Sequence, residues 1–130
     1  NVRVVAHSVS DIFEQLLRLD KDDLIIGIGF PRYSSRTVEV LRYAKNNGAT
    51  VVALTDSLLS PLASEADYTL LAQSNMASFV DSLVAPMSVI NALIVGVGMK
   101  ERANISKYFE KLEHIWDQHN VYTDRSKPDE

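Results

Sequence analysis

The chain has 130 residues, of which 46% are hydrophobic and 23% charged, and it contains no cysteine. This length suits one domain, and the composition excludes disorder, collagen and a coiled coil as descriptions of the whole chain. The absence of cysteine excludes disulfides and thiolate ligands and is typical of a cytoplasmic protein. The net charge of −4 argues against direct DNA binding by this chain, because most DNA-binding domains are basic.

The first part of the chain alternates apolar runs with helical patterns. Val2–Ala6 predicts a strand, and the apolar spacing over Ile12–Leu19 predicts a helix. Leu24–Phe30 is apolar without alternation, which is typical of a strand buried on both faces of a parallel sheet. A second helix is expected over Thr37–Asn46, ended by Asn47–Gly48 as its C-terminal cap.

The middle of the chain continues this alternation. Thr50–Thr55 is again apolar and predicts a third strand. Ser60 followed by Pro61 predicts a single-turn helix, with the serine as N-cap and the proline at the first helical position. Tyr68–Ala72 predicts a fourth, shorter strand.

Two helices are expected in the last part of the chain. Ser78–Asp81 has capping-box spacing and predicts a helix that runs to about Met99. Its apolar stretch from Leu83 is interrupted by polar residues, proline and glycine and is shorter than the roughly 20 apolar residues of a membrane span, so we expect a buried helix and no membrane contact. Glu101–Gln118 predicts an amphipathic helix, and residues 123–130 form a polar tail.

Strands that alternate with helices through short connections predict right-handed βαβ crossovers. The expected fold class is therefore α/β, a three-layer αβα domain with a doubly wound parallel sheet. No linker or internal repeat divides the sequence, and one domain is expected over residues 1–122.

The loop between the second predicted strand and its helix is the main candidate site. Ligands of open α/β sheets bind at the carboxyl ends of the strands, and residues 32–37 place three serine and threonine hydroxyls and two guanidinium groups there. A helix N-terminus with such donors suits a phosphate or carboxylate. The same pattern also arises when Ser34 or Ser35 only caps the helix and the arginines are solvated.

Other polar residues give weaker indications. Asp56 follows a strand and is interpreted as a turn former, and Glu39 is interpreted as a partner of the helix dipole. His7 lies at a predicted strand end. His7, Glu39 and Asp56 are the candidates for a general base, and none of the three is convincing. His114 and His119 are five positions apart, which is not the spacing of paired metal ligands on a helix. No catalytic residue, metal or cofactor is predicted.

Several blocks of the sequence resemble one known family. The segments FPRYSSRTVEVLRYAK and ALTDSLLSPLASEAD, within residues 24–72, resemble the sugar isomerase (SIS) domain that senses ligands in RpiR-type transcription regulators. The later segment SFVDSLVAPMSVINALIVGVG resembles the C-terminal part of the same group. The resemblance implies an effector domain that binds a phosphorylated sugar without turnover. It further implies a dimer or tetramer and DNA contact only through an upstream helix-turn-helix domain.

The phosphate loop of this family reads S-x-S-G-x-T. Ser34 matches its second serine and Thr37 its threonine, whereas Arg32 and Ser35 replace the first serine and the glycine. The resemblance therefore implies that Ser34, Ser35 and Thr37 hold the phosphate, that Arg32 assists and that Tyr33 lines the pocket.

The family's domain opens with a strand, a glycine-rich turn and a helix that do not precede Asn1 in this sequence. We therefore expect a fold that lacks its first strand-helix unit, either because the chain is a fragment or because another copy completes the sheet. Two alternatives remain open. One is an enzyme of the phosphosugar isomerase type on the same fold, and the other is an assembly module with a vestigial sugar site.

Overall fold

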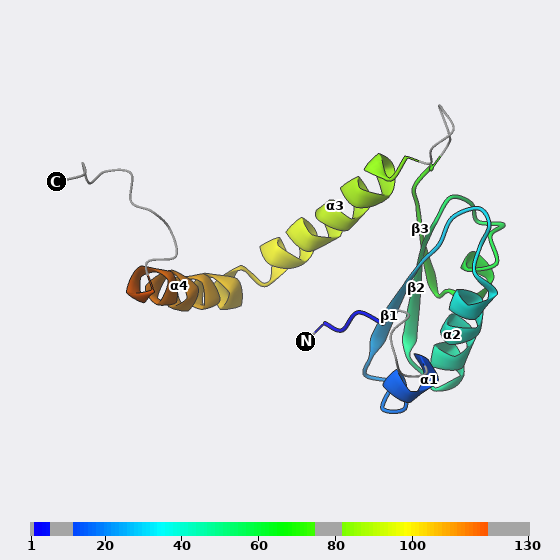
Figure 1. The fold of residues 1–130 in the computed structure, drawn as a ribbon, viewed down its shortest axis with the longest axis horizontal. Coiled ribbons are helices and arrows are strands. Elements are labelled where there is room, and N and C mark those ends of the chain that lie inside the picture. Colours follow the sequence, from blue (N-terminus) through cyan, green and yellow to red (C-terminus); the bar gives the residue numbers. More distant parts are fainter. Residues whose placement is uncertain (1, 6–11, 75–81, 120–130) are drawn as a thin grey trace. The chain divides into compact units, whose positions relative to one another are not determined.

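A computed structural model of the chain describes residues 2–5, 12–74 and 82–119. The chain divides into two compact units, Asn1–Ile90 and Asn91–Glu130. The first unit holds a small parallel sheet with its helices (Figure 1).

The sheet contains three strands, β1 (Leu24–Ile28), β2 (Thr50–Thr55) and β3 (Tyr68–Leu71). Their order is β1-β2-β3, and both pairings are parallel. The three strands follow one another in space as they do in the sequence, so every crossover connects neighbouring strands. This arrangement confirms the predicted parallel sheet and the last three predicted strands.

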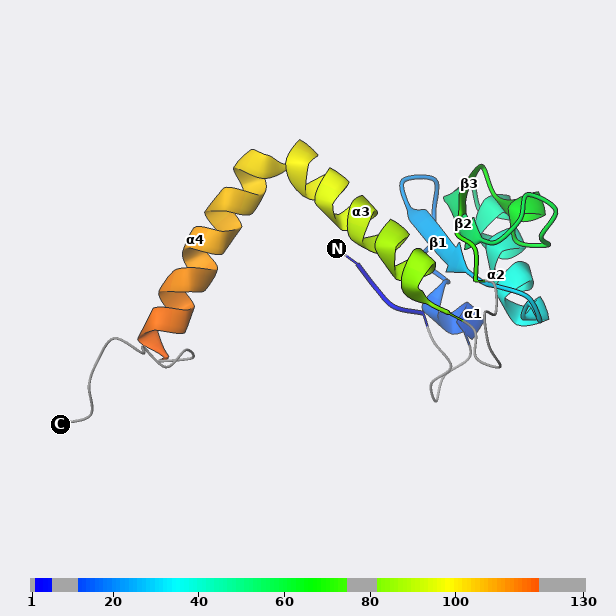
Figure 2. The same ribbon diagram turned by 90° about the horizontal axis from the view of Figure 1, so that it is seen from above.

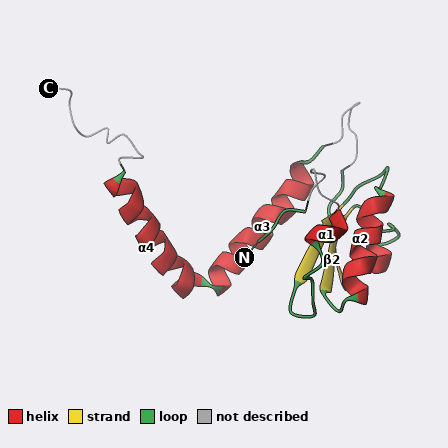
Figure 3. Ribbon diagram, turned by 60° about the horizontal axis from the view of Figure 1, so that its bottom comes forward, coloured by secondary structure: helices red, strands yellow, loops and turns green. Residues whose placement is uncertain are grey.

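One face of the sheet is covered by α2 (Ser35–Asn46) together with the short 3-10 helix η1 (Ala63–Glu65). Figure 3 shows α2 running alongside the strands. Leu41 of α2 is fully buried and belongs to the same core cluster as Val51. A Cβ atom at Gly27 would lie 2.6 Å from Leu41 Cδ1, so this glycine lets the helix approach β1 closely.

The C-terminal end of α2 agrees with the sequence prediction, and its start is shifted. The helix begins at Ser35, two residues before the predicted start, because Ser34 takes the N-cap position. At the other end Asn47 is the C-cap, and Gly48 has a φ of 86°, a backbone conformation that favours glycine. The predicted Asn47–Gly48 cap is therefore confirmed.

The helix α1 (Ile12–Gln15) packs against α2 and is shorter than predicted. Its continuation to Leu19 consists of turns that are held by backbone hydrogen bonds. The Phe13 ring meets the Tyr43 ring edge-on, with 5.5 Å between centroids.

The predicted strand over Val2–Ala6 is wrong for its described part. Residues 2–5 form no strand, and both Val2 and Val4 are exposed. A strand requires a neighbour for its backbone hydrogen bonds, and among the described residues β1 pairs with β2 alone.

The expectation that β1 is buried on both faces is also wrong within this chain. Leu24, Ile26 and Ile28 are 58%, 47% and 49% exposed, because α2 and η1 cover the opposite face of the strand. β2 follows the expectation, since Val51, Ala53 and Leu54 are all fully buried.

The predicted single-turn helix is confirmed with a shifted start. It begins at Ala63 as η1, after a turn that contains Pro61. The Ser60 hydroxyl accepts a hydrogen bond of 3.1 Å from the Ala63 backbone N–H, so this serine still satisfies a donor at the helix start.

Two longer helices follow, α3 (Val84–Lys100) and α4 (Arg102–Gln118), as predicted (Figure 2). The expectation that the apolar α3 is buried is wrong within this chain, because Val84, Ile94 and Met99 are 73%, 64% and 75% exposed. The apolar residues of α3 are spread around the whole helix, so a single neighbouring element would cover only some of them. The predicted capping box at 78–81 and the tail at 123–130 lie outside the described residues.

Among the described helices, none is by itself long and apolar enough to span a membrane. Only when α3 and the Ile105–Gln118 segment of α4 are taken together, as a pair with a bend between them, are they long and apolar enough.

Candidate functional site

The candidate site lies where β1 and β2 end and their loops begin. The loop from Gly29 to Ser34 connects β1 to α2, and Asp56 begins the loop that follows β2. Because the strands are parallel neighbours, both loops leave the same edge of the sheet. All five residues predicted for ligand binding lie in the first loop or in the first turn of α2.

The N-terminus of α2 is capped by Ser34, whose backbone is extended. Its Oγ accepts a hydrogen bond of 3.4 Å from the Thr37 backbone N–H. Ser35 is the first residue of the helix, and its side chain is exposed. The first turn contains no acidic residue, so the partial positive charge of the helix end is not neutralised there by a carboxylate of its own turn.

Arg32 has an unusual backbone conformation, with a φ of 66°. It is the one described residue other than glycine with a positive φ, and this conformation is strained for a residue with a Cβ atom. Its side chain is exposed and makes no ion pair with another described residue. The guanidinium group is therefore available at the edge of the loop.

Tyr33 links the two loops. Its hydroxyl donates a hydrogen bond of 2.6 Å to Asp56 Oδ1, and the buried Thr55 hydroxyl donates to the same oxygen at 3.2 Å. The Tyr33 hydrogen bond, which favours the charged carboxylate, holds the pKa of Asp56 below its usual value. The same hydrogen bond, together with burial and the nearby negative charge, raises the pKa of Tyr33.

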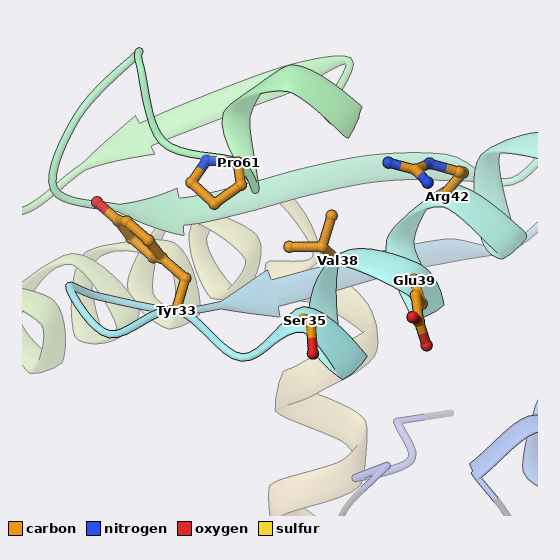
Figure 4. A pocket seen from close by; sticks show the side chains of 6 residues that line it. All are labelled: Tyr33, Ser35, Val38, Glu39, Arg42 and Pro61. Carbon is orange, nitrogen blue, oxygen red and sulfur yellow. The ribbon is translucent and has the colours of Figure 1, made fainter.

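An open hollow of about 390 Å³ lies beside the start of α2. Figure 4 shows the Tyr33 ring and Pro61 at one end of this hollow and Arg42 at the other. The Arg42 guanidinium is held there by an ion pair of 2.7 Å with Glu65 of η1. The hollow is lined by six residues: Tyr33, Ser35, Val38, Glu39, Arg42 and Pro61.

The structure changes the interpretation of two residues. Asp56, which the sequence predicts to be a turn former, is the acceptor that holds Tyr33. The position of Asp56 directly after the strand next to β1 is the signal that could have predicted this contact. Glu39 lies exposed on α2 and lines the hollow, whereas His7 lies outside the described residues.

The described histidines do not form a metal site. His114 lies 3.2 Å from Gln118 on α4. Among the residues that the structure describes, no group of three or more histidine, aspartate or glutamate side chains is placed to hold a metal ion.

Comparison with protein families matches residues 1–96 to the SIS domain. The chain belongs to the SIS domain family. This confirms the resemblance that the loop and its flanking segments indicate.

Two curated relatives of this SIS domain are named as HTH-type transcriptional regulators. One, from Caldanaerobacter subterraneus subsp. tengcongensis, is 32% identical over 103 residues, which are 76% of this chain and 36% of the relative. The other, from Haemophilus influenzae, is 44% identical over 59 residues, which are 45% of this chain and 20% of the relative. This SIS domain therefore spans about a third or less of the length of these relatives.

A solved structure supports the fold. The crystal structure of an RpiR transcription factor from Sphaerobacter thermophilus (sugar isomerase domain) matches with a TM-score of 0.74 and 30% identity. The match covers 78% of this chain and 57% of that one. The predicted α/β fold of the SIS type is confirmed, and the described three-stranded sheet is a part of such a domain.

Proposed function

We propose that this SIS domain is the effector-binding part of a DNA-binding transcription regulator and that it binds a phosphorylated sugar without turnover. The observation that carries the proposal is the position of the α2 N-terminus at the carboxyl edge of the sheet. Ser34, Ser35 and Thr37 lie at this helix end, and the exposed Arg32 precedes it.

The chemistry of the loop suits a phosphate group. The first-turn N–H groups and hydroxyls are hydrogen-bond donors, and the α2 end has a partial positive charge. The Arg32 guanidinium adds a full charge with a planar pair of donors that matches phosphate oxygens. Since Tyr33 is tied to Asp56, its ring lines the neighbouring hollow, where the sugar would lie.

The carboxylates near the loop favour binding over turnover. An isomerase requires a general base with a pKa near the working pH. The pKa of Asp56 is held low, and its Oδ1 already accepts two hydrogen bonds. Glu39 lies exposed to solvent on α2. These features weigh against the isomerase alternative.

If the chain were an assembly module with a vestigial sugar site, side chains of the loop itself would be expected to fill that site. The side chains of Arg32, Ser34 and Ser35 are instead exposed, which supports a loop that can still receive a ligand.

The relatives supply the argument for regulation. Both are named HTH-type regulators, and this chain spans only part of their length. We propose that a helix-turn-helix domain outside this chain contacts DNA in the cytoplasm. A dimer or tetramer would couple ligand binding to the spacing of two such domains, and it would also bury exposed apolar residues of α3. Light scattering of the intact protein measures this assembly, and a monomer would contradict it.

Isothermal titration tests the proposed ligand class. The probes are a panel of sugar phosphates, the same sugars without phosphate, and inorganic phosphate. Binding is expected for at least one sugar phosphate and not for its parent sugar. Arg32→Ala should weaken that binding by about tenfold, the loss expected for one charge-assisted hydrogen bond.

Arg18→Ala is the matched control, because Arg18 is an exposed arginine outside the loop and its removal should leave the affinity unchanged. Absence of heat with every sugar phosphate would overturn the proposal. NMR spectra of the bound sugar phosphate after prolonged incubation test turnover, and conversion to an isomer would favour the enzyme.

A further inference from the structure

We infer that Asp56 is a positioning residue, which holds the loop before α2 in its ligand-binding conformation through the Tyr33 hydroxyl. This inference rests on the proposed function, which makes that loop the ligand-binding loop. It adds a residue outside the S-x-S-G-x-T pattern to the site and gives Tyr33 a role beyond that of a pocket wall.

The contact is placed where it can restrain the loop. Tyr33 lies between the strained Arg32 and the N-cap Ser34, so a restraint on its side chain acts on both neighbours. The hydrogen bond from its hydroxyl to Asp56 Oδ1 measures 2.6 Å, in the range of strong hydrogen bonds to a carboxylate. In Figure 4 the Tyr33 side chain extends from the loop toward the end of β2.

The acceptor is itself held by the core of the domain. Thr55 is fully buried at the end of β2, and its hydroxyl donates to the same Oδ1 atom at 3.2 Å. The Tyr33 ring packs against the core cluster that contains Leu41 and Leu62. The loop is therefore tied to the sheet by a polar contact at the Tyr33 hydroxyl and by an apolar contact along its ring.

The Arg32 backbone explains why such a restraint is needed. A non-glycine residue at a φ of 66° costs free energy and persists only where its surroundings hold it. Without the tie, Arg32 would relax to an ordinary backbone conformation, and the direction of its guanidinium relative to the α2 N-terminus would change. The fixed loop therefore lowers the ordering cost of ligand binding.

Hydrogen–deuterium exchange at the Thr37 and Val38 amides, which donate to Ser34 at the start of α2, tests the restraint in the intact protein without any ligand. Tyr33→Phe and Asp56→Ala should each speed exchange about fivefold, the factor that corresponds to loss of one hydrogen bond. The double variant should exchange no faster than either single variant, because both changes remove the same contact. Asp56→Asn should restore slow exchange, since its amide oxygen still accepts from the tyrosine hydroxyl.

Glu65→Gln is the control variant. It alters another polar contact between α2 and the segment after β2, the ion pair with Arg42, and should leave exchange at the Thr37 and Val38 amides unchanged. Unchanged exchange in both Tyr33→Phe and Asp56→Ala would overturn the inference.

Titration of the same variants with glucose 6-phosphate and inorganic phosphate separates positioning from direct contact. Positioning predicts that Tyr33→Phe and Asp56→Ala lose the same fraction of affinity and that Asp56→Asn recovers it. Loss in both Asp56 variants with unchanged exchange would make Asp56 a direct ligand contact and would overturn the positioning role. If the unaltered protein binds neither these probes nor any sugar phosphate of the panel, the proposed function fails, while the exchange data still decide whether Asp56 holds the loop.

Discussion

The sheet face beneath α2 and the helix α3 are both apolar and both contain glycine, yet they differ in burial and in packing. Beneath α2, Val51 and Ala53 are fully buried, and the helix approaches Gly27 until no space for a Cβ atom remains. Along α3, apolar side chains are exposed, and a Cβ atom at Gly96 would meet nothing within 4 Å. Apolar composition indicates that a segment is stabilised by burial, but close packing also requires a neighbouring element of complementary shape.

The largest expected contrast is between two leucines. Leu41→Ala removes a fully buried side chain from the core beneath α2 and should lower the free energy of unfolding by about 3 kcal/mol. Leu24→Ala changes a half-exposed residue of β1 and should cost less than about 1 kcal/mol. Urea unfolding of the two variants measures the difference, and equal losses would contradict it.

The two glycines give a smaller contrast with opposite signs. Gly27→Ala places a methyl group against Leu41 and should lower the free energy of unfolding by about 2 kcal/mol. Gly96→Ala adds a methyl group to open space inside a helix and should raise helix stability by about 0.5–1 kcal/mol. Thermal unfolding followed by circular dichroism measures both changes, and a stabilising Gly27→Ala would show that the packing at β1 can adapt.

At the edge of the packed face, Ser34→Ala tests the cap of α2. Loss of the Oγ acceptor for the Thr37 N–H should cost about 1 kcal/mol of unfolding free energy. Ser64→Ala is a control, since the Ser64 hydroxyl donates to the Pro61 carbonyl and caps no N–H group. Equal small effects would mean that the 3.4 Å contact at Ser34 contributes little.

The smallest expected effect is a pH dependence at the Tyr33–Asp56 contact. Because the pKa of Asp56 is lowered in the folded chain, its contribution to stability is present above about pH 4 and is lost as the pH falls through the folded pKa. The stability difference between the unaltered chain and Asp56→Asn should therefore shrink in acid. Denaturant unfolding between about pH 2.5 and 6 measures it, and parallel pH profiles would contradict the contact.

The sequence predicts the packed region well because local signals and tertiary contacts agree there. The C-terminal cap at Asn47–Gly48 and the apolar β2 are where the pattern places them, and α2 begins only two residues before its predicted start. The prediction fails at Val2–Val5, where a β-branched run has no neighbouring strand among the described residues. Strand propensity depends on such neighbours, and one chain's sequence does not say whether they are present.

The candidate site was predictable in position and only partly in its contacts. The hydroxyl and arginine residues of this strand-to-helix loop predict an anion site, which stays a prediction. The structure places Arg32, Tyr33 and Ser34 directly before the first residue of α2. The role of Asp56 could not be derived from spacing, because its contact with Tyr33 joins residues that are distant in the sequence. The positive φ of Arg32 could not be predicted either, because arginine does not favour this backbone conformation.

The single oxygen shared by Tyr33 and Thr55 has a consequence for the evolution of this domain. A change at position 33 that removes the hydroxyl leaves the carboxylate at position 56 without its main donor, and the reverse change leaves a phenol without an acceptor. Selection should therefore act on the two positions as a pair. In an alignment of SIS domains with this loop, tyrosine at position 33 and aspartate at position 56 are expected to be gained and lost together.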